Sequence, residues 1–125
     1  MKSFIYGAIG ALLVILIYLF AGPQFSNYRA FAESSAWLEQ IKSQQKIVEE
    51  RALNQHSFDG AGLGLSIGEL KPVSPLFSEI KDNGVIILRG GSDGQALVLI
   101  PYFKDGGVVW QCIGGSAKAV PARCK

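Results

Sequence analysis

The two cysteines, Cys112 and Cys124, are the residues of this 125-residue chain whose type and spacing point most directly to chemistry. Eleven residues lie between them, so they do not form a CxxC redox motif. A zinc site needs four ligands, and the single histidine, His56, lies in a stretch with no ligand pattern. We therefore expect a structural disulfide, which closes a short loop and contributes about 3 kcal/mol in the chain-entropy model. Such a bridge is typical of a domain in an oxidising compartment.

The other polar residues do not favour an enzyme, a cofactor or a metal centre. We find no Ser-His-Asp spacing and no carboxylate pair with an evident geometry, and His56 fits a helix end better than a general base. Residues 60–68, GAGLGLSIG, follow no predicted strand and open no predicted helix, so they do not predict a phosphate loop. The acidic residues of the predicted helix are assigned to its solvated face: Glu33, Glu39, Glu49 and Glu50.

The N-terminal part of the chain has the length and composition of a membrane anchor. Eighteen almost wholly apolar residues run from Phe4 to Ala21, and a spanning helix needs roughly 17 to 25. A cleaved secretory signal is the alternative, but its apolar region is shorter, about 7 to 15 residues. We expect residues 1–27 to form the membrane or filament-core half of a helix, kinked at Gly22 and Pro23. The predicted disulfide places residues 28–125 outside the cytoplasm.

Beyond the anchor, the apolar pattern predicts that the helix continues to about Leu53. Mostly apolar residues recur at spacings of three and four and form one face. These residues are Phe31, Ser34, Leu38, Ile41, Gln45, Val48 and Ala52. This face must be covered by the C-terminal part of the chain.

The C-terminal part predicts an antiparallel meander. Glycines and prolines after His56 indicate a loop, with a short strand around Leu63–Ile67. Glycine-rich turns then separate three β-branched runs, which predicts consecutive hairpins. The runs are Val85–Arg89, Gln95–Phe103 and Val108–Cys112. The fold class is therefore α+β, with one long helix laid across a small sheet. Trp110 is predicted to anchor the core over the disulfide, while Trp37 is left open between the sheet and a neighbouring subunit.

The order of these elements resembles that of the type IV pilins. The resemblance rests on a strand ending in proline, a glycine turn, a Trp-x-Cys strand and a Pro-x-x-Cys terminus. These features lie in Gly94–Pro101, Gly106–Cys112 and Val120–Cys124, and Ala21–Trp37 is similar to the stretch where a pilin helix leaves the membrane. The resemblance implies a major or minor pilin that is held in the inner membrane with its domain in the periplasm. It then polymerises with other pilin subunits through the N-terminal helix and reaches the cell surface.

The same resemblance implies that the disulfide loop contributes to subunit contacts and adhesion. Its cations, Lys118, Arg123 and Lys125, are compatible with acidic host glycans or DNA phosphates, but three cations without an aromatic platform fit a merely solvated surface better.

The chain departs from the family pattern at the N-terminal processing site. Aligning Pro23 with the helix proline of the family places Met1 where the mature chain would begin, and Tyr6 where a glutamate would stand. A phenol, with an ordinary pKa of about 10, carries no charge near neutral pH. The open alternatives are a start further upstream, a pilin-like protein that skips leader cleavage, and a processing site that has decayed. The alternative function is a membrane-anchored, pilin-like accessory or binding protein that is not polymerised.

Overall fold

The structure, a computed structural model, describes residues 28–125. The predicted anchor, residues 1–27, and the predicted kink at Gly22 and Pro23 lie outside the described residues. Among residues 28–125, no helix combines the length and the apolar character that crossing a bilayer requires.

The described part begins with a helix that is interrupted at one position. Residues 28–40 are helical, Ile41 forms a turn, and helix α2 runs over Lys42–Gln55. The i to i−4 pattern continues through the turn, because the Ile41 N–H donates to the Trp37 carbonyl and the Gln45 N–H donates to the Ile41 carbonyl, both at 3.0 Å. His56 ends α2 in the left-handed conformation, with φ of 55°. This confirms His56 as a helix-end residue, and the last residue of α2, Gln55, is two residues beyond the predicted end at Leu53.

One face of this helix is buried, largely as the apolar pattern predicted. The buried positions are Ala30, Glu33, Ser34, Trp37, Leu38, Ile41, Val48 and Ala52. The prediction was wrong for Phe31, which is 40% exposed, because Ala30 and Glu33 occupy the inward positions of that turn. It was also wrong for Glu33, which was assigned to the solvated face and is only 2% exposed.

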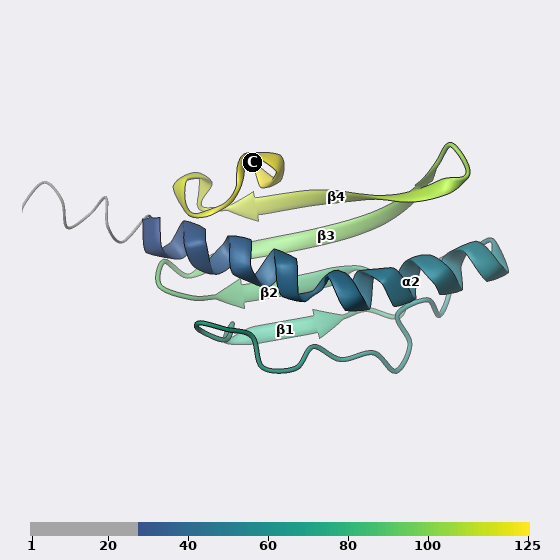
Figure 1. The fold of residues 1–125 in the computed structure, drawn as a ribbon, viewed down its shortest axis with the longest axis horizontal. Helices are drawn as coiled ribbons and strands as arrows, with labels where there is room; N and C mark the ends of the chain where they lie inside the picture. The colour runs from purple at the N-terminus through teal and green to yellow at the C-terminus, as the bar shows by residue number, and fades with distance from the viewer. Residues whose placement is uncertain (1–27) are drawn as a thin grey trace, which may run out of the picture.

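The sheet is a four-stranded antiparallel meander in the order β1-β2-β3-β4. Its strands are β1 (Phe77–Ile80), β2 (Ile86–Gly90), β3 (Gln95–Lys104) and β4 (Gly107–Gly115). Figure 1 shows the helix lying along one face of the sheet, which gives two layers. The predicted α+β class and the three predicted strands are confirmed, and β1 is an additional strand. No strand forms at residues 63–67, so that prediction was wrong.

The main core lies between the first part of the helix and the sheet. Trp37, Leu38 and Ile41 pack with inward side chains of β2 and β3, which are Ile86, Leu88, Leu97 and Leu99. Val120 and Cys124, from the C-terminal loop, complete the same cluster. Trp37 therefore packs on its own sheet, and its indole N–H donates to the Val73 carbonyl at 2.6 Å. This settles the choice that the sequence left open.

Polar side chains along one edge of the helix hold the loop between α2 and β1. Gln40 pairs with the backbone of Lys71, donating to its carbonyl at 2.6 Å and accepting from its N–H at 3.0 Å. Arg51 donates to the Leu63 carbonyl at 2.8 Å. Gln44 and Gln55 make similar side-chain bonds to carbonyls of the same loop. These bonds replace the strand pairing that was expected there, because a side chain can satisfy a loop carbonyl as a neighbouring strand would.

Candidate functional site

The predicted disulfide between Cys112 and Cys124 is formed. Cys112 belongs to β4, whereas Cys124 lies in the short 3-10 turn η2 (Ala122–Cys124) and is fully buried. The bridge therefore joins the last strand to the C-terminus and closes the loop that the sequence indicated. This loop, residues 113–123, is the first candidate for a functional surface.

The loop is packed on the sheet from one side and exposed on the other. It contains a second short turn, η1 (Ala117–Ala119), followed by Val120, which is buried in the core. Gly114 allows this close packing, since a β-carbon there would lie 3.0 Å from Val120 Cγ1 and 3.1 Å from the Cys124 carbonyl oxygen. The three predicted cations, Lys118, Arg123 and Lys125, are all exposed. The loop thus presents basic side chains on an ordered support.

A hydrogen-bonded network connects the loop to the helix. The Ser116 hydroxyl donates to the Asp93 carboxylate at 3.0 Å, and Asp93 lies in the turn between β2 and β3. The adjacent Ser92 donates from its N–H at 2.9 Å and from its hydroxyl at 2.5 Å to the two carboxylate oxygens of Glu33. Sequence reasoning missed this network because its members lie far apart in the chain.

Glu33 is the most unusual ionisable residue in this network. Burial by itself raises the pKa of the Glu33 carboxyl, but hydrogen bonds from Ser92 and Gln95, together with the nearby Arg29, lower its pKa below the ordinary value. The Gln95 side chain donates to Glu33 at 3.3 Å and to the Ala30 carbonyl at 3.2 Å. The carboxylate is therefore held in its charged form and fixes the β2–β3 turn to the helix.

Trp110 lies on β4 and is half-buried. It packs against the main core and against a second buried cluster, which consists of Val48, Ala52 and Ala61. Its indole N–H donates to a Glu49 carboxylate oxygen at 2.7 Å. Trp110 and Cys112 are both half-buried on a strand whose exposure alternates, so they share its inward face. The assignment of Glu49 to the solvated face was wrong, because this carboxylate is half-buried and bound to Trp110.

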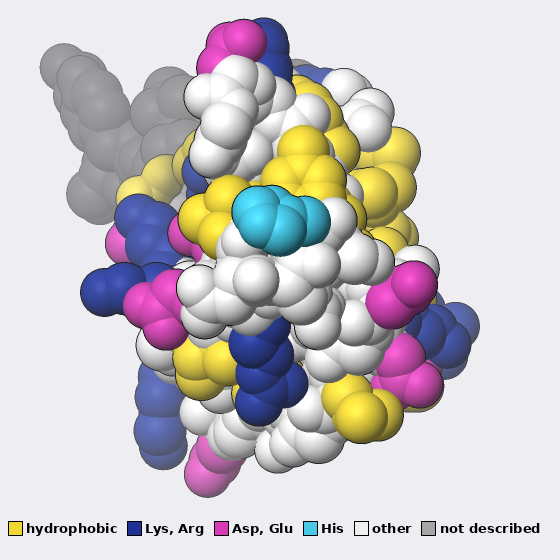
Figure 2. Space-filling view, turned by 90° about the vertical axis from the view of Figure 1, so that its right-hand side faces the viewer, with side chains coloured by type: hydrophobic (Ala, Val, Ile, Leu, Met, Phe, Trp, Pro, Cys, Tyr) yellow, Lys and Arg dark blue, Asp and Glu magenta, His cyan; other side chains and the backbone are white. Residues whose placement is uncertain are grey.

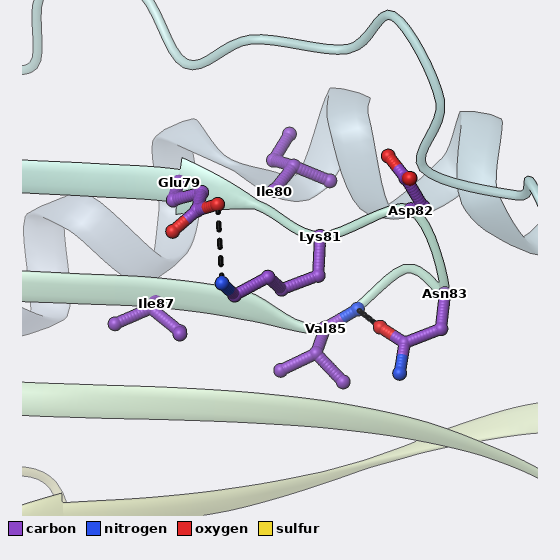
Figure 3. Close-up of a pocket in the computed structure, with 7 residues that line it drawn as sticks. All are labelled: Glu79, Ile80, Lys81, Asp82, Asn83, Val85 and Ile87. Atoms are coloured by element: carbon purple, nitrogen blue, oxygen red, sulfur yellow. Dashed lines mark hydrogen bonds and ion pairs between the residues drawn. The ribbon is translucent and has the colours of Figure 1, made fainter.

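A hollow of about 620 Å³ lies at the β1–β2 hairpin, where sequence reasoning had placed no site (Figure 3). Val85 and Ile87 contribute apolar side chains, and Lys81 pairs with Glu79 at 3.2 Å. The Val85 N–H donates to the Asn83 side-chain oxygen at 3.2 Å. Its lining residues include neither a histidine nor a hydroxyl or thiol nucleophile. The lining of this hollow therefore holds no Ser–His or Cys–His pair.

A smaller hollow of about 240 Å³ lies at the end of the molecule where α2 meets the β3–β4 hairpin. Leu53, His56, Phe103 and Gly106 line it. Figure 2 views this end and shows the histidine bordered by apolar side chains. The Phe103 ring contacts Phe58, with centroids 4.4 Å apart. Within residues 28–125, no cluster of three or more His, Cys, Asp or Glu side chains is placed to hold a metal ion.

Comparison of the chain with family models, with curated proteins and with solved structures finds no match.

Proposed function

We propose that this chain is a structural subunit of a type IV pilus, either a major or a minor pilin. The observation that carries the proposal is the combination of a helix laid along a four-stranded antiparallel meander with a disulfide that joins the last strand to the C-terminus. The apolar run Phe4–Ala21 precedes that helix in the sequence, with residues 22–27 between them. The resemblance in residues 94–124 relates the same order of elements to the pilins.

In this proposal, the apolar run is stored in the inner membrane and is later packed among the corresponding runs of other subunits. Tyr28, the first residue that the structure describes, is 70% exposed, and Phe31 in the next turn of the helix is also exposed. Aromatic side chains at this end of the domain gain burial when neighbouring subunits pack against them, at about 25 cal/mol per Å² of apolar surface removed from water. The exposed aromatic residues at the helix entry thus support packing between subunits.

The disulfide loop supplies the outer contact surface in this proposal. Lys118 and Arg123 are exposed on a loop that is anchored by the bridge, by Val120 and by the Ser116–Asp93 bond, and the exposed Lys125 follows this loop directly. A preorganised loop binds with a smaller loss of conformational entropy than a free one. Acidic glycans or DNA phosphates are the ligand classes that its charge fits, through an attraction that weakens with salt.

A membrane-tethered, pilin-like accessory protein is the second candidate. The observation that favours it is Tyr6, which stands where the family resemblance places a glutamate. That glutamate is thought to pair with the terminal amine of a neighbouring subunit, and a phenol that is neutral near pH 7 does not form this ion pair. The two candidates differ in where the mature protein is found.

Shear fractionation separates them. The full chain is expressed in a piliated bacterial host, surface filaments are sheared off, and filaments and membranes are analysed by blot and by intact mass. A pilus subunit is recovered in the filament fraction, whereas a tethered protein remains with the membranes. Replacing Tyr6 with Glu provides a matched variant, which should raise recovery in filaments if the missing carboxylate limits assembly. Recovery of both forms only in membranes would count against the pilus proposal.

A further inference from the structure

The two edge strands of the sheet differ sharply in how they are protected against pairing with another strand. An open edge presents unpaired backbone groups, and proteins protect it with short strands, charged residues or proline. β1 has this protection: it has four residues, contains Glu79, and is flanked by Pro75 and Lys81. β4 lacks it, because its nine residues, Gly107–Gly115, include neither a charged residue nor a proline. Within the described residues, β4 pairs with β3 alone.

Only the first part of the β4 edge is free of the C-terminal loop. The turns η1 and η2 lie beside the end of β4 (Figure 1), and Gly114 approaches Val120 and Cys124 closely. Cys112 is bridged to Cys124, so the loop is held against β4 from residue 112 onward, and Gly107–Gln111 precede that point on the side of the β3–β4 hairpin. The open edge is therefore a five-residue segment, GVVWQ.

This segment is compatible with pairing to an identical copy of itself. In an antiparallel pair centred on Val109, each Val109 faces the other, each Val108 faces Trp110, and each Gly107 faces Gln111. No like charges meet in this register, since the segment carries no charge. Val109 is 38% exposed, and its partner on β3, Tyr102, is 41% exposed. Two copies would align Tyr102, Val109, Val109 and Tyr102 in one apolar row across the joined sheets.

We propose that β4 is an interaction surface at which two copies of this chain join their sheets, through antiparallel pairing of residues 107–111. The partner is a second copy rather than an unrelated strand because the uncharged, self-matching register and the apolar Tyr102–Val109 row are both properties of this chain. The inference does not rest on the proposed function, since a pilus subunit and a tethered protein both present the same edge.

Photo-cross-linking of the full chain in bacterial membranes tests the proposal. A photoreactive amino acid is placed at the exposed Gln111, and in a separate control at Ser78 on the opposite edge strand. The expected result is a cross-linked band at about twice the monomer mass of 13.4 kDa from position 111, and no such band from position 78. A band from position 111 at another mass would identify a different partner protein and overturn the pairing of two copies.

Charge substitutions test the register. Val109→Lys should abolish the band, because two lysines would then face each other at the centre of the pair. Ile113→Lys is the matched control, because Ile113 is on the same face of β4 and 49% exposed but lies outside the open segment. The cross-linked dimer band of this variant should therefore persist.

Co-expression of differently tagged Val109→Lys and Val109→Glu chains should restore a cross-linked dimer that contains one chain of each kind. Thiol labelling before and after reduction checks that the disulfide, and hence the fold, is intact in each variant. An unchanged band in folded Val109→Lys would refute the proposal.

Discussion

Ser92 binds the buried carboxylate of Glu33 twice, through its N–H at 2.9 Å and its hydroxyl at 2.5 Å, although 59 residues separate them in the sequence. This contact fixes the β2–β3 turn on the helix. The same turn holds the disulfide loop through the bond between Asp93 and Ser116. The Glu33 carboxylate therefore helps to fix the loop relative to the helix, in addition to the disulfide and the buried Val120, and the first two predictions concern it.

Glu33→Gln should lower the free energy of unfolding by about 1.5 to 3 kcal/mol, the range for hydrogen bonds to a charged group. The amide brings an NH2 group toward donors on Ser92 and Gln95 and removes the charge that they stabilise. Ser34→Ala is the matched control, because Ser34 is equally buried but its hydroxyl has no hydrogen-bond partner within residues 28–125. Its removal should leave stability unchanged or raise it by up to about 1 kcal/mol. Thermal unfolding of the full chain in detergent measures both, and equal effects would contradict the assigned role of Glu33.

The contribution of Glu33 should depend on pH in a defined direction. Its pKa in the folded protein lies below the ordinary value of 4.5, so folding favours the charged carboxylate. The stabilisation is then fully present above the unfolded pKa and is lost as the pH falls through the folded pKa. The stability difference between the parent chain and Glu33→Gln should therefore be constant near neutral pH and shrink in acid below pH 4.5. A difference that grows on acidification would contradict the lowered pKa.

Trp110→Phe should destabilise the fold by about 1 to 3 kcal/mol, because it leaves the half-buried Glu49 carboxylate without the indole donor. Glu49→Gln keeps a side-chain oxygen that can accept from the indole, so its cost should be clearly smaller. Denaturant unfolding of both variants provides the comparison. If Trp110→Phe were as stable as the parent chain, the indole–carboxylate bond would contribute nothing measurable.

Gly84→Ala should cost at least about 2 kcal/mol, since a side chain is strained at positive φ and crowds its neighbour. Gly84 has φ of +88°, and a β-carbon there would lie 2.7 Å from Val48 Cγ1 on α2. Gly68→Ala is the control, because a β-carbon at Gly68 meets no atom within 4 Å. Melting temperatures should fall for the first variant only. Similar melting temperatures for both would show that the hairpin shifts away from α2 at little cost.

The sequence predicted the features that follow from local pattern. Spacings of three and four placed Leu38, Ile41 and Val48 on the buried helix face, and glycine turns separated the three longer strands. It missed β1, whose four residues, FSEI, are too few to show a clear alternation and include a serine and a glutamate.

The errors at Glu33 and in the loop before β1 share one physical cause, which is pairing between residues far apart in the chain. A glutamate on a helix is normally solvated, and only the folded chain brings Ser92 and Gln95 to Glu33. The loop expected to contain a strand is instead bound by helix side chains, such as Gln40 to Lys71. Of the candidate site, the cysteine spacing predicted the bridge. The network that supports the loop had no local signal in the sequence.

The most direct test of the central claim is immunogold electron microscopy of sheared filaments, using an antibody against residues 28–125 and a host that lacks the chain as the negative control. If the chain is a pilus subunit, gold particles should label the filaments. A major pilin should be labelled over the whole length of the filament, and a minor pilin at sparse or terminal sites. Gold confined to cell envelopes, with filaments unlabelled, would contradict the claim and favour the membrane-tethered protein.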